Sequence, residues 1–215
     1  REGLIPAGHV VAKAQLVLNP YKASSVQIEN VAQTNIDVVT PQIDDSNQNC
    51  IRVKGEQFDI QFNKQSGYMD KYAVRGMDMI KEGEALTPNF WRAPTDNDFG
   101  AGLQQKYAVW KNPGLKLQSL KADKVDGLVV VSAVYDMRSV SNATKLDLTY
   151  VINNQGAVKV TQKMSSDKNA KVANLFRFGM QLVMPKSFEK ISYYGRGPVE
   201  NYSDRNHCTD LGIYN

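Results

Sequence analysis

Apolar and polar residues alternate over much of this chain, and this alternation restricts the possible folds more than any other feature. Leu146, Leu148 and Tyr150 place apolar side chains at every second position, which puts them on one face of a β-strand. Residues 153–156, Asn-Asn-Gln-Gly, are typical of a turn, and the alternation resumes over 158–164. The sequence therefore predicts a β-hairpin.

Other segments repeat this pattern. Further strands are predicted at residues 58–62, 68–74, 128–137, 175–184 and 188–194. The run 128–137 is mostly apolar, which predicts a strand covered on both faces. Helical spacing of apolar residues, at i, i+4 and i+7, occurs only within 101–110. Long strands joined by tight turns predict an all-β antiparallel sandwich with that one helix.

Composition excludes several classes of protein. The net charge of +4 is spread along the sequence, as where lysines and acids alternate over 121–126, whereas a nucleic-acid-binding surface needs clustered basic residues. The sequence has no 18-residue apolar run, so we expect no membrane-spanning helix. Cys50 and Cys208 are expected to be free thiols, buried or partly buried. His9 and His207 lack the spacing of a zinc site.

The first 49 residues differ from the rest in composition. Residues 1–18 end in an apolar run that predicts a strand, and residues 19–49 are rich in Asn, Gln, Ser and Asp, as in a linker. We expect the sandwich to occupy 50–215. Because the chain starts at Arg1 rather than Met and ends without a charged or flexible tail, we also expect it to be a fragment of a longer protein.

A polar loop is predicted at residues 92–100, Arg-Ala-Pro-Thr-Asp-Asn-Asp-Phe-Gly. Pro94 fixes its own φ and keeps Ala93 out of the helical region. Asp96 and Asn97 favour turns, because their side chains hydrogen-bond nearby backbone groups. We therefore expect a rigid loop rather than a strand or a helix.

The two aspartates of this loop are a candidate pair of catalytic carboxylates. In an extended chain, Asp96 and Asp98 would lie roughly 6–7 Å apart, near the lower limit of the separation in inverting glycosidases. Acids this close in sequence more often stabilise their own loop, by capping N–H groups and by pairing with a cation such as Arg92. We predict this structural role for Arg92, Asp96, Asn97 and Asp98.

A second polar cluster is predicted after a pair of tyrosines near the end of the chain. Its members are Tyr194, Arg196, Glu200, Asn201, Asp204 and Arg205. Planar polar groups beside aromatic rings suit a carbohydrate-binding surface, but arginine and aromatic side chains also mark interfaces between domains. We favour the domain interface.

Three segments together resemble one protein family. They are 61–68 (Gln-Phe-Asn-Lys-Gln-Ser-Gly-Tyr), 87–100 (which contains Phe-Trp-Arg-Ala-Pro-Thr-Asp-Asn-Asp-Phe-Gly) and 193–205 (Tyr-Tyr-Gly-Arg-Gly-Pro-Val-Glu-Asn-Tyr-Ser-Asp-Arg). In sequence, order and spacing they resemble motifs of the C-terminal β-sandwich domain, or small chain, of family 2 β-galactosidases. Residues 6–9, Pro-Ala-Gly-His, are similar to the end of the immunoglobulin-like domain that precedes that sandwich.

The resemblance implies both a fold and a parent enzyme. The fold would be a supersandwich similar to that of galactose mutarotases, incomplete at residue 215 and preceded by the last immunoglobulin-like strand within 1–18. The parent would be a bacterial enzyme that hydrolyses terminal β-D-galactosides with retention, using two glutamates in a (β/α)₈ barrel that this chain lacks. The chain would then be an accessory part without catalytic residues, and inactive alone.

The resemblance also implies partners and cofactors. The chain would contact the barrel and other domains of the parent, which binds the galactoside. The parent's Mg²⁺ and Na⁺ would lie in the barrel, so no cofactor or metal is expected here. The parent would be soluble, and the sequence leaves open whether it is cytoplasmic or periplasmic.

Two other classes of function remain open. A non-catalytic carbohydrate-binding sandwich would bind galactosides without hydrolysing them, and a mutarotase-like epimerase would need a His/Glu acid–base pair in a cleft. Fold alone does not choose between these, but the loop motifs favour the galactosidase. If the sandwich continues beyond residue 215, uncovered strand edges predict that the chain self-associates.

Overall fold

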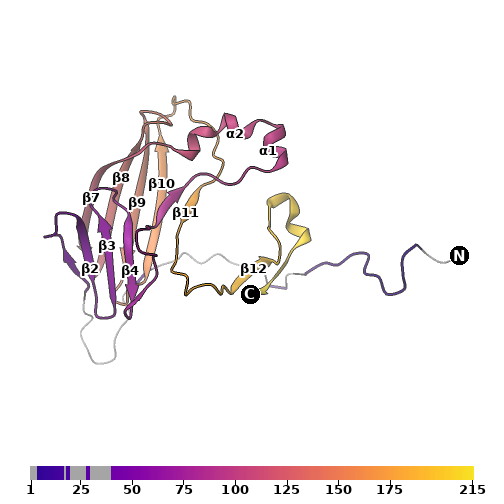
Figure 1. The fold of residues 1–215 in the computed structure, drawn as a ribbon, viewed down its shortest axis with the longest axis horizontal. Coiled ribbons are helices and arrows are strands. Elements are labelled where there is room, and N and C mark those ends of the chain that lie inside the picture. The colour runs from indigo at the N-terminus through magenta and orange to yellow at the C-terminus, as the bar shows by residue number, and fades with distance from the viewer. Residues whose placement is uncertain (1–3, 17, 20–27, 30–39) are drawn as a thin grey trace. The chain divides into compact units, whose positions relative to one another are not determined.

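Two antiparallel sheets form a β-sandwich in the computed structural model, which describes residues 4–16, 18–19, 28–29 and 40–215 (Figure 1). One sheet has the strand order β1-β2-β3-β4-β5 and the other β10-β9-β8-β7. The strands of the first sheet are β1 (Gln42–Asp44), β2 (Cys50–Lys54), β3 (Phe58–Asn63), β4 (Met69–Val74) and β5 (Met77–Asp78). Those of the second are β7 (Leu115–Val125), β8 (Leu128–Met137), β9 (Thr144–Ile152) and β10 (Val158–Ser166). The prediction of an all-β antiparallel sandwich is confirmed.

Two short sheets and four short helical segments complete the described secondary structure. The short sheets pair β11 (Gly179–Gln181) with β6 (Thr87–Asn89), and β12 (Tyr193–Gly197) with β13 (Asp210–Tyr214). The helical segments are α1 (Asp96–Gly100), α2 (Leu103–Lys106), η1 (Ala108–Lys111) and η2 (Ser203–Cys208).

The chain divides into two compact units. Residues 26–185 contain the sandwich and are called the sandwich unit here. Residues 1–25 and 186–215 contain the β12–β13 hairpin and are called the ribbon unit. The proposed boundaries at 18 and 49 stay predictions; the described residues between 4 and 16 have no strand, and much of the proposed linker lies outside the described residues.

The core lies between the two sheets of the sandwich unit. Every second side chain of β3, from Phe58 to Phe62, is buried, and so is every second one of β9. The rings of Phe62 and Tyr150 meet edge to face at 4.9 Å, and those of Tyr68 and Tyr135 stack at 5.4 Å. The alternation in the sequence therefore selects the residues that face the opposite sheet.

Both predicted hairpins are confirmed. β9 pairs with β10 and β3 with β4, in antiparallel register. The glycine of the first motif, Gly67, has φ +74°, and a Cβ there would lie 2.4 Å from the Tyr135 hydroxyl oxygen. Gly67 is thus required both for the turn and for the close approach of a core tyrosine.

Three other strand predictions need correction. β8 has the predicted bounds, but only one of its faces is buried, and the other is half-buried rather than covered. Of the strand predicted over 175–184, only Gly179–Gln181 is formed, and the strand predicted over 188–194 begins at Tyr193. Within 175–184 the apolar residues pack into an aromatic cluster instead of pairing as a strand, because the rings of Phe176 and Phe178 contact those of Trp91 and Phe90.

The helical predictions were partly wrong as well. The predicted helix 101–110 is split into α2 and η1 at Tyr107, whose φ of −110° is not helical. The segment 92–100, predicted to contain no helix, contains α1. Cys50 and Cys208 are free, as expected, but Cys208 is exposed rather than buried.

Candidate functional site

The acidic motif 92–100 forms a capped helix start in the sandwich unit. Thr95 is the N-cap of α1: its Oγ1 accepts from the N–H of Asp98 at 3.4 Å, and Asp98 Oδ2 accepts from the N–H of Thr95 at 2.8 Å. This reciprocal capping box supplies the start signal that allows a five-residue helix to follow Pro94. The pattern Thr-x-x-Asp is visible in the sequence, so this helix could have been predicted.

Arg92 joins this cap from outside the helix. Its Nη1 and Nη2 donate to the two carboxylate oxygens of Asp98 at 2.6 and 3.0 Å, and Nη1 also donates to the carbonyl of Ala93 at 3.1 Å. The bond predicted between Arg92 and this loop is therefore present. The planar guanidinium matches both oxygens, a geometry that a lysine cannot reproduce.

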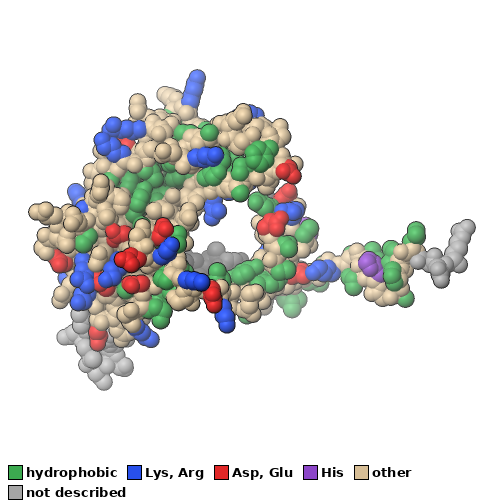
Figure 2. All heavy atoms as spheres, viewed as in Figure 1, with side chains coloured by type: hydrophobic (Ala, Val, Ile, Leu, Met, Phe, Trp, Pro, Cys, Tyr) green, Lys and Arg blue, Asp and Glu red, His purple; other side chains and the backbone are tan. Residues whose placement is uncertain are grey.

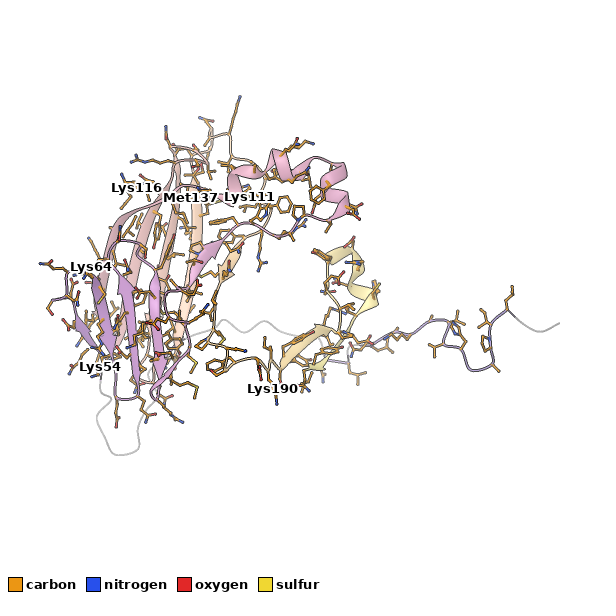
Figure 3. All side chains as sticks on the ribbon, in the orientation of Figure 1. Lys54, Lys64, Lys111, Lys116, Met137 and Lys190 are labelled. Carbon is orange, nitrogen blue, oxygen red and sulfur yellow. The ribbon has the colours of Figure 1, made fainter. Side chains whose placement is uncertain are left out.

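Aromatic rings support the guanidinium. The Cζ of Arg92 lies 4.4 Å from the ring centre of Phe176, which stacks on Trp91 at 4.7 Å. Lys111, labelled in Figure 3, places its Nζ 4.8 Å from the ring centre of Trp91. Cations thus contact both members of an aromatic stack, an arrangement with favourable cation–π energy. Phe176 was not among the predicted site residues, because no motif marks it.

The environment of Asp98 argues against acid–base chemistry at this loop. Asp98 is only 5% exposed, and the hydrogen bonds from Arg92 and from the Thr95 N–H lower the pKa of its carboxyl. A general acid of a glycosidase needs a raised pKa instead. Asp96 and Asn97 are exposed in the first turn of α1, where a negative charge is favoured by the helix dipole.

The second predicted cluster lies in the ribbon unit, where Arg196 closes the loop between β12 and β13. Its Nη1 donates to the carbonyls of Asn206 and Thr209, at 2.9 and 3.0 Å. The buried hydroxyl of Thr209 donates to Asn201 Oδ1 at 3.0 Å. Arg196 and Asn201 therefore hold the loop together rather than projecting freely from it.

The other members of the cluster are at the surface. Arg205 pairs with Glu200 at 2.6 Å and lies over the ring of Tyr202, 5.5 Å from its centre. The hydrogen bond from Arg205 lowers the pKa of Glu200. Asp204 and Tyr194 are exposed, so the cluster presents an exposed ion pair and tyrosine rings.

Sequence reasoning missed a third charged group, on the outer face of the five-stranded sheet. Asp59 accepts from Arg52 Nε at 2.6 Å and from Lys71 Nζ at 2.9 Å. A depression of about 740 Å³ lies beside it, at the turns that end β2 and β4. Lys54, Arg75, Glu56 and Asp78 also line this depression. The group was missed because its members are each unremarkable in sequence and meet only across neighbouring strands.

Among the described residues, no group of three or more His, Cys, Asp or Glu side chains is placed to hold a metal ion. No helix in the described part is long and apolar enough to cross a membrane.

The fold is an antiparallel sandwich with an acidic loop that an arginine holds in place. Comparison with known sequences identifies the protein family. Residues 54–215 match the family described as "Beta galactosidase small chain". The chain therefore belongs to the β-galactosidase small-chain family, which confirms the resemblance seen in its motifs.

Individual relatives agree. The chain is 28% identical over 208 residues to a "Beta-galactosidase" of Priestia megaterium, covering 97% of this chain and 19% of that protein. It is 34% identical over 176 residues to a "Beta-galactosidase" of Lactobacillus delbrueckii subsp. bulgaricus, covering 81% and 17%. A "Beta-galactosidase" of Psychromonas ingrahamii is 31% identical over 233 residues, covering 95% and 21%. The chain thus spans about a fifth of the length of these relatives.

Proposed function

We propose that this chain is an accessory part of a retaining family 2 β-galactosidase, an enzyme that hydrolyses terminal β-D-galactosides. Its role would be to stabilise the catalytic barrel by packing against it and to form part of the entrance to the active site. The nucleophile and acid/base would be glutamates of the barrel, and the parent's Mg²⁺ and Na⁺ would bind there too. The compartment, cytoplasm or periplasm, would follow that of the parent.

One observation carries the non-catalytic role of this chain. In the acidic loop, the carboxylate best placed for chemistry, Asp98, is buried and held ionised by Arg92. A retaining glycosidase needs one carboxyl group that gives up a proton and a second that attacks the sugar. Asp98 is suited to neither step, because its two oxygens already accept hydrogen bonds from Arg92 and Thr95.

Turnover of a chromogenic β-galactoside tests the proposal. We expect no hydrolysis by the purified 215-residue chain, and activity when the same residues are part of a full-length protein with a barrel. Hydrolysis by the isolated chain that is lost in Asp96→Asn or Asp98→Asn would refute the accessory role.

A carbohydrate-binding role is the second candidate, and the exposed rings of Tyr194 and Tyr202 favour it. Titration with a galactoside, followed by NMR of the tyrosine rings, separates the two functions. Saturable changes in the chemical shifts of the tyrosine rings that Tyr194→Ala abolishes would support binding. If these chemical shifts do not change, the domain-interface role is favoured. The mutarotase-like alternative predicts faster anomer interconversion of galactose, which polarimetry measures.

We also propose that the isolated chain self-associates. The large exposed apolar side chains of the ribbon unit support this, since such surfaces tend to recruit another chain. They include Ile191, Tyr193, Tyr194, Val199, Tyr202 and Ile213.

A further inference from the structure

The outer edge of β13 is occupied by side chains from the start of the chain. The N–H of Leu211 donates to Gln15 Oε1 at 2.7 Å, and its carbonyl accepts from Gln15 Nε2 at 2.9 Å. Beside it, Lys13 pairs with Asp210 at 2.5 Å. One carboxamide therefore makes both bonds that a residue of a third strand would make with Leu211.

The rest of this edge is open within the described residues. Because both backbone groups of Leu211 point away from β12, those of Ile213, two residues on, point the same way. No described residue bonds to them. Ile213 and its partner across the hairpin, Tyr194, are each 75% exposed, and Figure 2 shows hydrophobic side chains at the surface of this hairpin.

β13 also lacks the usual protection of an edge strand. Its sequence, Asp-Leu-Gly-Ile-Tyr, contains no lysine and no proline, the residues by which natural sheets discourage further pairing. Its one charge, on Asp210, is neutralised by Lys13. A two-stranded hairpin is marginally stable by itself, so a third strand would add hydrogen bonds that the hairpin lacks.

One partner fits this edge by symmetry, namely β13 of a second copy of this chain. With a two-fold axis at Gly212, Leu211 lies opposite Ile213 of the second copy, and each such pair exchanges both N–H···O bonds. At the axis the two copies of Gly212 form the close pair, with Cα atoms about 4.5 Å apart. The exposed Tyr194 and Ile213 then continue into Leu211 of the second copy on one face.

We propose that the β13 edge is the surface through which this chain self-associates, and that Gln15 is a guard that competes with the second copy for it. The inference rests on the self-association proposed above, to which it assigns a surface and a competitor. It is independent of the β-galactosidase assignment. When the Gln15 side chain leaves the β13 edge, its two hydrogen bonds to Leu211 are replaced by backbone hydrogen bonds between the two copies.

The first test changes the guard and the edge separately. Sedimentation velocity of the 215-residue chain should show dimerisation about tenfold tighter in Gln15→Ala, which loses two hydrogen bonds that compete with pairing. Gln118→Ala is the matched control, because Gln118 is an exposed glutamine that bonds only to the nearby Lys116 carbonyl. Ile213→Lys places a charge on the edge and should leave a monomer.

The second test fixes the register. In a Cys50→Ser, Cys208→Ser background, Gly212→Cys should form a disulfide-linked dimer under mild oxidation, since paired Cα atoms at the axis lie within disulfide range. The atoms nearest to a Cβ at Gly212 are two ring carbons and the hydroxyl oxygen of Tyr214, each at 3.4 Å, which is van der Waals contact, so the substitution fits. Ile213→Cys is the control and should cross-link poorly, because Ile213 faces Leu211 and not itself.

The outcomes separate the surface from self-association in general. Equal dimerisation of the wild type and Gln15→Ala would show that Gln15 does not compete with the second copy for the edge. Dimers that persist in Ile213→Lys and do not cross-link through Gly212→Cys would mean that another surface is used. A monomer in every variant would overturn self-association as well.

Discussion

Arg92 and Arg205 make the same kinds of contact in different surroundings. Each arginine pairs with a carboxylate at 2.6 Å and lies over an aromatic ring, Phe176 for Arg92 and Tyr202 for Arg205. The side chains of the Arg92–Asp98 pair are 26% and 7% exposed, whereas those of Arg205–Glu200 are 50% and 61% exposed. Residue type alone does not distinguish the two pairs.

The difference lies in what each pair would lose if it were broken. Asp98 would be left buried without its cation, and the cap of α1 would lose its support. Glu200 would remain exposed to water. The loss of stability would be small, because exposed ion pairs contribute little to stability. The buried pair is therefore suited to fixing the fold, and the exposed pair is available to a neighbouring domain or a sugar.

The largest expected effect is the loss of stability in Arg92→Ala. Because the buried Asp98 carboxylate loses its partner, we expect the Tm of the sandwich unit to fall by about 5–10 °C. Arg205→Ala should lower Tm by less than about 1 °C. Differential scanning calorimetry of the two variants, with Arg92→Lys as an intermediate, measures the difference. Equal losses would show that burial does not separate the pairs.

The pH dependence of the buried pair gives the second prediction. The folded-state pKa of Asp98 lies below the ordinary value of 3.8, so its ionised form adds stability above pH 3.8. This contribution is lost as the pH falls below 3.8 through the lowered pKa. Unfolding by urea should therefore show wild type more stable than Asp98→Asn at pH 6, with the gap closing below pH 3.8. A gap that is constant down to pH 2 would contradict the assignment.

The sequence predicts the sandwich better than its loops. The hairpins at β3–β4 and β9–β10 were predictable because period-two alternation directly records which side chains face the core. The strand predicted over 175–184 failed because Phe176 and Phe178 are drawn into aromatic contacts with residues about 85 positions away. Such contacts have no local signal.

The candidate sites show the same division. The role of Arg92 was predictable from its place before a proline and an acidic loop, and Thr95-x-x-Asp98 is a capping box that the sequence displays. The Asp59 group and the Gln15–Leu211 contact were not predictable. Gln15 and Leu211 are separated by 196 positions and meet only through folding.

A smaller effect is expected from the cap itself. Thr95→Ala removes the oxygen that accepts from the Asp98 N–H, at a cost of about 1 kcal/mol. Thr95→Ser keeps that oxygen and should restore most of the loss. Chemical unfolding of both variants measures this. If Thr95→Ala were as damaging as Arg92→Ala, the cap rather than the ion pair would hold the loop.

The smallest effect on stability, and the sharpest test of the comparison, concerns salt. Arg205 lowers the pKa of Glu200 from its ordinary value of 4.5, and in an exposed pair this shift should shrink when the Debye length falls to about 3 Å at 1 M salt. The pKa of Asp98 should move less, because its hydrogen bonds are buried. NMR titration of both carboxyl groups at low and high salt measures the two shifts, and Glu200 in Arg205→Ala supplies the unpaired reference.

Since the contribution of Glu200 is present above pH 4.5 and lost below it, Glu200→Gln should change Tm by less than about 1 °C even at pH 7. Equal salt sensitivity of the two carboxyl groups would mean that the buried pair is screened like a surface pair, and the contrast between Arg92 and Arg205 would fail.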